Sequence, residues 1–153
     1  MQKVTTCVYS HNGEVLLLNK PRRDWWVAPG GKVIEGESIA EGCMREFYEE
    51  TGLKSELLQL VSIFTVVNKK DDQVVNEWMF YTFKTDSVSG MQLFDNHEGY
   101  LEWHPFEKIS QLPMAEGDRL ILNHALNGHG IMIGTFVYSE DFELLETRYS
   151  IHP

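Results

Sequence analysis

The chain has 153 residues, enough for one domain with its own core, and 42% of them are hydrophobic, as in soluble globular proteins. The formal net charge of −10 argues against a broad surface for nucleic acid or for an anionic membrane. Anionic small molecules stay open as ligands, because bound metal ions can supply local positive charge. With no internal repeat and no linker, residues 1–153 are expected to form a single domain.

The cysteines and the hydropathy of the chain bear on its location. The sequence contains no apolar run of 18 residues and no visible signal peptide. Cys7 lies in a predicted strand, and Cys43 lies on the apolar stripe of a predicted helix. Both are expected to be reduced core residues, which favours a cytoplasmic protein.

A β-hairpin is predicted at the start of the chain. Residues 3–10 alternate in polarity and are rich in β-branched side chains, and residues 14–19 supply a returning strand. Between them, Asn12-Gly13 is a strong hairpin turn.

A basic loop and a glycine-containing bend follow the hairpin. In the loop, Arg22 and Arg23 could contact substrate phosphates or could simply face solvent. Residues 29–31 are predicted to form a bend, where the absence of side chains on two glycines lets the backbone approach a ligand closely.

The stretch from residue 30 to residue 53 contains a helix with clear ends. Ser38 and Glu41 form a capping box, so a helix should begin near Ile39. Gly52 suits the left-handed position that ends a helix. Apolar residues at helical spacing predict one buried stripe, made of Ala40, Cys43, Met44 and Phe47.

Three acidic residues share another part of this helix. Glu46, Glu49 and Glu50 stand at positions i, i+3 and i+4, where like charges repel by about 0.2–0.5 kcal/mol per pair. Arg45 can relieve part of this repulsion through Glu49, four residues on, and a divalent cation would relieve more. The alternative is a solvated acidic helix face without a ligand.

The second half of the chain is predicted to add strands and one more helix. Apolar or alternating runs predict strands at 57–67, 74–84, 100–103, 131–138 and 142–149. A short helix or turn is expected at 105–112, and a longer helix at about 118–126. The predicted strand at 74–84 contains the aromatic residues Trp78, Phe80 and Tyr81, which could line a wall. A place in the core is favoured for most of them.

The acidic helix belongs to a longer pattern of fixed spacing. Gly31 is followed after five residues by Glu37, and then come Arg45-Glu46, Glu49-Glu50 and Gly52-Leu53. This arrangement resembles the full signature of the Nudix hydrolases. The resemblance implies an α/β protein, the Nudix α/β/α sandwich, with a mixed β-sheet and a catalytic loop-helix-loop.

The resemblance also implies a chemistry and a set of residues. It implies metal-dependent hydrolysis of a diphosphate linked to another moiety, with Mg²⁺, for which Mn²⁺ can substitute, as the cofactor. The expected metal ligands are the Gly30 carbonyl, Glu46, Glu49, Glu50 and Glu98, the last in a loop before a strand. Arg45 is expected to orient the glutamates, one of which takes the proton. Glu37 is expected to brace the loop, and Gly31 and Gly52 are structural.

The layout of the chain looks most like the MutT-type 8-oxo-dGTP diphosphatases, which release a monophosphate and pyrophosphate. That likeness places Glu116 and Asp118 beside the nucleobase, although Asp118 could equally cap a helix, and Trp26 could stack on the base or wedge the structure. Val27 and Ala115 replace an asparagine and a tryptophan of many relatives. ADP-ribose, dinucleoside polyphosphates, a broad nucleotide range, or a non-catalytic ligand-sensing role remain alternatives. A nucleotide is the expected partner, rather than a nucleic-acid polymer or a membrane.

Overall fold

The computed structural model describes residues 1–153 and contains two α-helices, one 3₁₀ helix and twelve strands. The first half comprises β1 (Gln2–His11), β2 (Glu14–Lys20), β3 (Trp25–Val27), β4 (Gly30–Lys32), α1 (Ile39–Thr51), β5 (Leu53–Ser55) and β6 (Gln59–Lys70). The second half comprises β7 (Gln73–Thr85), β8 (Val88–Gly90), β9 (Asp95–Asn96), β10 (Gly99–Pro105), the 3₁₀ helix (Phe106–Gln111), α2 (Glu116–Asn127), β11 (Ile131–Ser139) and β12 (Leu144–His152).

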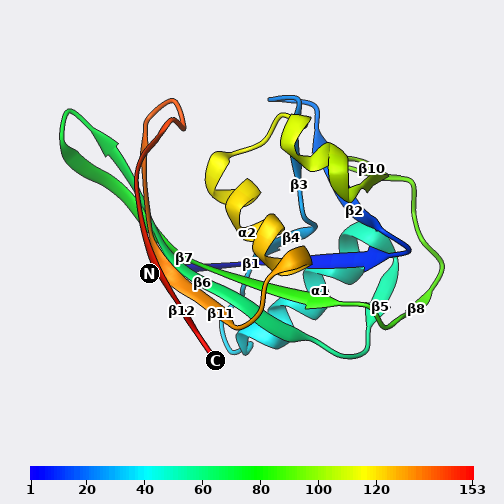
Figure 1. The fold of residues 1–153 in the computed structure, drawn as a ribbon. Helices are drawn as coiled ribbons and strands as arrows, with labels where there is room; N and C mark the ends of the chain where they lie inside the picture. The colour runs from blue at the N-terminus through cyan, green and yellow to red at the C-terminus, as the bar shows by residue number, and fades with distance from the viewer.

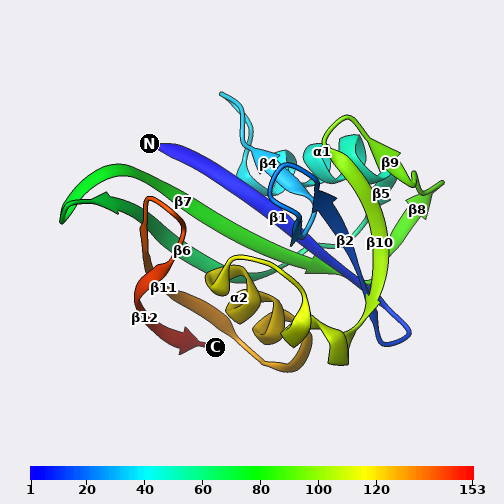
Figure 2. The same cartoon turned by 90° about the horizontal axis from the view of Figure 1, so that it is seen from above.

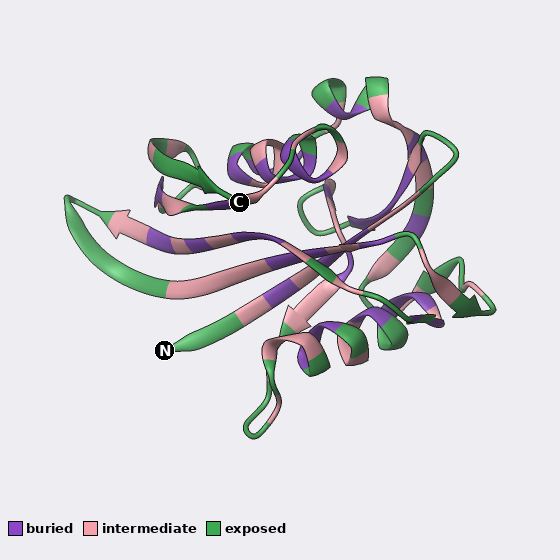
Figure 3. Cartoon of the chain, turned by 60° about the horizontal axis from the view of Figure 1, so that its bottom comes forward, coloured by how far each residue is buried: buried purple, intermediate pink, exposed green.

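Ten strands form one mixed sheet in the order β12–β11–β6–β7–β1–β2–β10–β9, with β3 paired to β2 and β4 paired to β1. The pairs β1–β7 and β6–β11 are parallel, and the other pairs in this sheet are antiparallel. Helix α1 packs against β1 and β4, and α2 packs mainly against β6 (Figures 1 and 2). Figure 3 shows the strands between the two helices, with buried segments facing both. The predicted mixed sheet with flanking helices is therefore confirmed.

Helix α1 has the ends that its sequence predicts. The Ser38 hydroxyl accepts a hydrogen bond of 3.0 Å from the Glu41 amide, and the Glu41 carboxylate accepts one of 2.8 Å from the Ser38 amide. Gly52 ends the helix with a φ of 77°, in the left-handed region. A Cβ atom on Gly52 would also collide with the Met91 carbonyl, so the position needs glycine for two reasons.

The buried face of α1 differs from the predicted stripe. Cys43 and Phe47 are fully buried, but Met44 is exposed and Ala40 is only partly buried. The side chain of Glu50 is instead buried, although it belongs to the acidic set. The physical reason is that the last turn of α1 lies against β4, whose Gly30 amide supplies a polar partner for this carboxylate.

The bend predicted at residues 29–31 is confined to Pro29. Gly30 begins strand β4, which pairs antiparallel with β1 through Thr6 opposite Gly30 and Thr5 opposite Gly31. A Cβ atom on Gly30 would overlap the main-chain carbonyl of Thr5. The glycine is therefore required by the close approach of β1 and not by a turn.

Helix α2 begins two residues before the predicted start, and this overturns the proposed cap. Ala115 is the N-cap residue, so Asp118 lies inside the first turn and does not cap the helix. Gly117 lies inside the helix as well, where its amide donates a hydrogen bond of 2.8 Å to the Tyr138 hydroxyl. A Cβ atom on Gly117 would collide with that hydroxyl, so glycine is needed at this position of the helix to leave room for Tyr138 of β11.

The remaining predicted segments are largely confirmed, with longer strands than the sequence suggests. The short strands β3, β5, β8 and β9 were not predicted, and of these β5 pairs with β8. Cys7 and Cys43 are both buried and free, as expected. No helix of the structure has the length and the apolar character needed to cross a membrane.

Candidate active site

Arg45 is the centre of the polar network on α1. Its guanidinium binds Glu37 in a bidentate manner, at 2.6 Å and 3.0 Å. Nη1 also donates to the Glu46 carboxylate at 3.0 Å and to both Glu49 oxygens at 3.2 Å, while Nη2 donates to the Lys32 carbonyl at 3.0 Å. These bonds raise the pKa of Arg45, and the guanidinium lowers the pKa of Glu37. One cation thus fixes three carboxylates and ties α1 to β4.

The two glycines of β4 place their backbone directly beside two of the acids. The Gly30 amide donates a hydrogen bond of 2.7 Å to Oε1 of Glu50. The carboxylate of Glu46 occupies the space that a side chain on Gly31 would need. A larger residue at position 31 would therefore displace Glu46, which gives this motif glycine a physical role.

Glu50 and Glu98 form a coupled pair of carboxyl groups. Burial and, after it, the neighbouring Glu98 together raise the pKa of Glu50 to about 9, whereas the Gly30 hydrogen bond opposes the rise. The interaction with Glu50 holds the pKa of Glu98 below its usual value, with help from Lys20. The Lys20 ammonium lies 3.8 Å from the Glu98 carboxylate. The two carboxyl groups therefore titrate as a pair that shares a proton, and burial favours the protonated form of Glu50 over that of Glu98.

Asn96 links these two acids through its amide side chain. Its Nδ2 donates a hydrogen bond of 2.8 Å to the main-chain carbonyl of Glu50, at the end of α1. Its Oδ1 accepts hydrogen bonds from the amides of Glu98 at 2.7 Å and Gly99 at 3.2 Å. The loop that carries Glu98 is therefore fastened to the helix that carries Glu50.

The donors present fit a hard divalent cation, although no three of them converge into a preformed cage. Oε2 of Glu50 is buried and has no hydrogen-bond partner, which is costly for a carboxylate unless another group satisfies it. Glu46 and Glu49 of the same helix and Glu98 of the loop before β10 offer further carboxylate oxygens, and Gly30 offers a carbonyl. Mg²⁺ uses few protein carboxylates and keeps several waters, so it does not require a cage.

A cavity of about 230 Å³ opens beside these acids and is lined by 17 residues. Gly30, Gly31, Glu50 and Lys20 form its polar part. Six of the other lining residues are aromatic, namely Trp25, Trp78, Phe80, Phe136, Tyr138 and Phe142. An apolar, aromatic chamber joined to a polar part suits a ligand with a planar ring at one end and anionic groups at the other.

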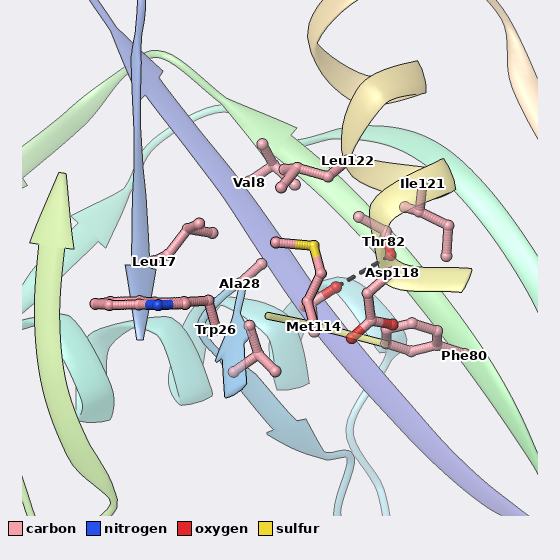
Figure 4. Close-up of a pocket in the computed structure, with 12 residues that line it drawn as sticks. Val8, Leu17, Trp26, Ala28, Phe80, Thr82, Met114, Asp118, Ile121 and Leu122 are labelled. Atoms are coloured by element: carbon pink, nitrogen blue, oxygen red, sulfur yellow. Dashed lines mark hydrogen bonds between the residues drawn. The ribbon is translucent and has the colours of Figure 1, made fainter. Parts of the chain in front are cut away.

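Asp118 is the one acid among the aromatic residues of this chamber. It lines the large cavity and also an adjoining one of about 20 Å³, and its carboxyl group points from α2 toward Phe80 (Figure 4). Burial raises the pKa of Asp118 to about 6, and the positive charge of Lys20 opposes the rise. Near neutral pH this carboxyl can therefore accept hydrogen bonds, and at slightly lower pH it can donate one.

The other predicted substrate residues do not gather around the large cavity. Glu116 is exposed and forms an ion pair with Arg119 at 3.2 Å, outside the cavity lining. Trp26 is buried against Tyr100 and His104 and borders only the small cavity, on the far side from Asp118 (Figure 4). The structure thus places Trp26 and Glu116 outside the lining of the large cavity, and the packing of Trp26 agrees with the structural wedge that the sequence also allowed.

The two arginines of the basic loop have separate surroundings. Arg23 places its guanidinium over the rings of Trp25 and Phe142, at 5.2 Å and 4.7 Å, so it lies at the border of the large cavity. Arg22 lies beside Glu98 in a shallow depression of the surface, which Lys20 also lines. Either cation is within reach of an anionic ligand held near Glu98 or the cavity border.

Several residues of the site were not predicted from the sequence. Lys20 lines the cavity and faces Glu98, whereas only Arg22 and Arg23 were predicted as possible contacts of the substrate phosphates. A place in the core was favoured for most of Trp78, Phe80 and Tyr81, and all three pack against it, but Trp78 and Phe80 also line the cavity. The strand alternation on β7, which puts positions 78 and 80 on one face and 81 on the other, could have separated them.

Comparisons with known proteins agree with this geometry. The family model described as NUDIX domain matches residues 1–125. A Bacillus subtilis protein, the uncharacterized Nudix hydrolase YvcI, is 47% identical over 148 residues, which are 97% of this chain and 94% of that protein. The crystal structure of a mutator MutT protein from Bacillus halodurans is 45% identical with a TM-score of 0.95, and the match covers both chains completely. A second B. subtilis protein, provisionally named an 8-oxo-dGTP diphosphatase, is 32% identical over 66 residues, which are 43% of this chain and 44% of that protein.

Proposed function

This chain belongs to the Nudix family of pyrophosphohydrolases, and on that basis we propose that it hydrolyses purine nucleoside triphosphates with a divalent metal, with 8-oxo-dGTP as the specific candidate. The products would be a nucleoside monophosphate and pyrophosphate. The observation that carries the proposal is the position of Glu50. Its unpartnered carboxylate oxygen belongs to a residue that lines the same cavity as six aromatic side chains, so a metal-bound diphosphate and a nucleobase can occupy one continuous space.

Mg²⁺ is the proposed cofactor, with Mn²⁺ as a substitute, because all the donors are oxygen atoms. The residues proposed to hold it are the Gly30 carbonyl, Glu46, Glu49, Glu50 and Glu98. When bound, the ion neutralises phosphate oxygens and makes a coordinated water more acidic. A cation at the pair of Glu50 and Glu98 also replaces their shared proton, because it favours both ionised forms.

The protein groups have distinct tasks in the proposed reaction. Arg45 keeps Glu46 and Glu49 in fixed orientations and does not contact the substrate, since its donors are already engaged by protein groups. Lys20 adds positive charge where the diphosphate enters. A water oxygen attacks phosphorus in line with the leaving oxygen, the anhydride P–O bond breaks, and one of the glutamates accepts the proton of the water.

The preference for a purine is inferred from the aromatic chamber and from Asp118. Aromatic rings supply stacking surface for a planar base. An oxidised guanine carries an N–H at N7, where guanine has an acceptor, and an ionised Asp118 can accept from this N–H group. The likeness to MutT proteins supports the same substrate class.

A nucleotide panel tests this proposal directly. The protein is incubated with 8-oxo-dGTP, the four common deoxynucleoside triphosphates, ADP-ribose and a dinucleoside polyphosphate, each with Mg²⁺, with Mn²⁺ or with excess chelator. We expect pyrophosphate release that is fastest for 8-oxo-dGTP, and no turnover in chelator. A preference for ADP-ribose or the dinucleoside polyphosphate would reassign the substrate within the family. Full turnover in chelator would disprove the metal mechanism, and the absence of turnover on every compound would favour a ligand-sensing role.

A further inference from the structure

The wall of the nucleobase chamber is formed in part by a segment that the family model does not reach. The match to that model ends at residue 125, whereas β11, β12 and the turn between them occupy residues 131–152. This C-terminal hairpin contributes three of the six aromatic residues that line the large cavity, Phe136, Tyr138 and Phe142. The substrate chamber therefore depends on residues outside the part of the chain that carries the hydrolase signature.

The first two of these rings are held rigidly. Phe136 is stacked on Phe64 of β6, with the ring centroids 3.9 Å apart and the planes at 3°. The Tyr138 hydroxyl accepts a hydrogen bond from the Gly117 amide at 2.8 Å, which fixes the ring against α2. Strand β11 pairs in parallel with β6 over eight consecutive positions, so its side chains cannot shift by one residue without reversing which face they occupy.

Phe142 is the third ring, and its backbone conformation is unusual. Its φ is 60°, in the left-handed region that residues other than glycine rarely adopt. The turn is fixed by the Phe142 amide, which donates to the Ser139 carbonyl at 3.0 Å, and by the Ser139 amide, which donates to the Glu143 carbonyl at 2.9 Å. Such a conformation persists only where the surroundings hold it, and it often accompanies a functional constraint.

The strained turn brings the Phe142 ring to a second segment of the cavity wall. The ring packs edge-on against Trp25 of β3, with 6.1 Å between centroids, and lies 5.6 Å from Tyr138. The Arg23 guanidinium covers both Phe142 and Trp25. Residues more than 110 positions apart in the sequence, counted from Trp25 to Phe142, thus meet at one side of the chamber.

We propose that the C-terminal hairpin selects the nucleobase, with Phe142 as the residue that favours purines over pyrimidines. The inference rests on the proposed hydrolysis of nucleotides. A purine has two fused rings and covers more of an aromatic wall than a pyrimidine, so it loses more when one ring of that wall is removed. The metal-binding acids come from α1 and the loop before β10, so the hairpin acts on binding and not on the chemical step.

The test compares full-length variants on dGTP and dCTP with Mg²⁺. Phe142→Ala removes the ring, Phe142→Gly removes the ring and also accepts the positive φ, and Phe142→Tyr retains the ring. Leu145→Ala is the matched control, since Leu145 lies on the same hairpin, is 57% exposed and does not line the cavity. Melting temperatures are measured for each variant to identify any loss of the fold.

We expect Phe142→Ala and Phe142→Gly to raise the KM for dGTP by about five- to a hundredfold, the range that stacking contributes per base. The KM for dCTP should rise less than about threefold and kcat should change less than about twofold, in keeping with an effect on binding alone. Phe142→Tyr and Leu145→Ala should both behave as the unmodified protein does. Equal changes in KM for both nucleotides, a loss confined to kcat, or failure of Phe142→Tyr to restore the preference would overturn the proposal.

Binding measurements separate this inference from the proposed function. Calorimetric titration of dGMP and dCMP requires no hydrolysis, so it reports on the chamber even if the reaction has been assigned wrongly. Tighter binding of dGMP that is lost in Phe142→Ala supports the hairpin as the selecting element. Equal binding of the two monophosphates before and after the substitution overturns it, whatever the activity panel shows.

Discussion

The side chain of Asn96 donates a hydrogen bond of 2.8 Å to the main-chain carbonyl of Glu50. The same side chain accepts the amide of Glu98 at 2.7 Å, so one residue fixes the spacing of the two coupled carboxyl groups. Asn96 does not line the large cavity, and none of its hydrogen bonds is made to a carboxylate oxygen. It is a positioning residue, and its effect should appear in the affinity for the metal.

Asn96→Ala should therefore weaken Mn²⁺ binding, because it frees the Glu98 loop from the end of α1. Partners that orient metal ligands contribute about 10- to 100-fold in affinity, and we expect a loss in this range, measured by calorimetry. Phe94→Ala is the matched control, since Phe94 lies two residues before Asn96 and is 79% exposed. Equal Mn²⁺ affinities in the two variants would show that Asn96 contributes only to the stability of the loop.

Glu50→Gln should nearly abolish turnover, with kcat lower by at least about a hundredfold, because the amide keeps the volume but loses the charge that binds the ion. In the absence of metal, Glu50→Gln should also change how the free energy of unfolding depends on pH, whereas Glu49→Gln should not. Since burial raises the pKa of Glu50 to about 9, this group favours the folded state most at low pH, and the contribution declines as pH rises from about 4.5 through about 9.

Thermal unfolding in chelator across this pH range measures the effect. Glu50→Gln should flatten the decline, whereas Glu49→Gln should retain it, because the Glu49 side chain is 53% exposed. Glu49→Gln should nevertheless lose most of its kcat. Activity of either variant within about threefold of the unmodified enzyme, under about 1 kcal/mol, would show that the residue is not a metal ligand.

Glu98→Gln should be damaging, but less so than the helix substitutions. Glu98 sits on a loop, more exposed than Glu50, and Lys20 already compensates part of its charge at 3.8 Å. We expect a decrease in kcat of about tenfold, with a shift in the pH profile, since the partner that interacts with Glu50 would become neutral. Kinetics that match the unmodified enzyme at every pH would assign Glu98 to the solvated surface.

Asp118 should make base selectivity depend on pH. Above about pH 6 the ionised carboxylate accepts from the N7–H of 8-oxoguanine, and below it the protonated group can donate to N7 of guanine. The ratio of kcat/KM for 8-oxo-dGTP to that for dGTP should therefore fall as pH is lowered through about 6. Asp118→Asn should give a ratio that does not change with pH, and a ratio already constant in the unmodified enzyme would contradict base reading by Asp118.

The same substitution should affect stability with a defined sign. A buried carboxyl whose pKa is raised from 3.8 to about 6 contributes most to stability below pH 3.8, and this contribution is lost as pH rises through about 6. At pH 7, Asp118→Asn should thus be as stable as the unmodified protein or more stable, by up to about 3 kcal/mol. A large decrease in the melting temperature of Asp118→Asn would instead show that this carboxyl stabilises the fold, although Asp118 does not cap α2.

The local parts of the site were predictable because short-range rules determine them. The capping box at Ser38 and the left-handed Gly52 follow from neighbouring residues, and the structure confirms both. The spacing of the acids on α1 likewise comes from helix periodicity. The burial of Glu50 could not be predicted this way, because it depends on the approach of Gly30, which is 20 residues away.

The substrate chamber was less predictable, since distant segments form it. A helix cap was as plausible as base reading for Asp118, because an acid before an apolar run commonly caps a helix, but the helix starts earlier, at Glu116. The need for glycine at position 117 also depends on a distant residue, Tyr138 of β11. Phe142 gave no local signal at all, as its role depends on a contact with Trp25.

Arg45 has a consequence for how the protein acquires its metal. Because the guanidinium already compensates Glu37, Glu46 and Glu49, the acidic helix does not depend on a cation to fold. Some small metallo-domains obtain most of their folding free energy from binding the ion, and they unfold when the ion is withdrawn. Here we expect folding and metal loading to be separate events, so a chain made under magnesium starvation should accumulate intact and become active on resupply, without any new synthesis.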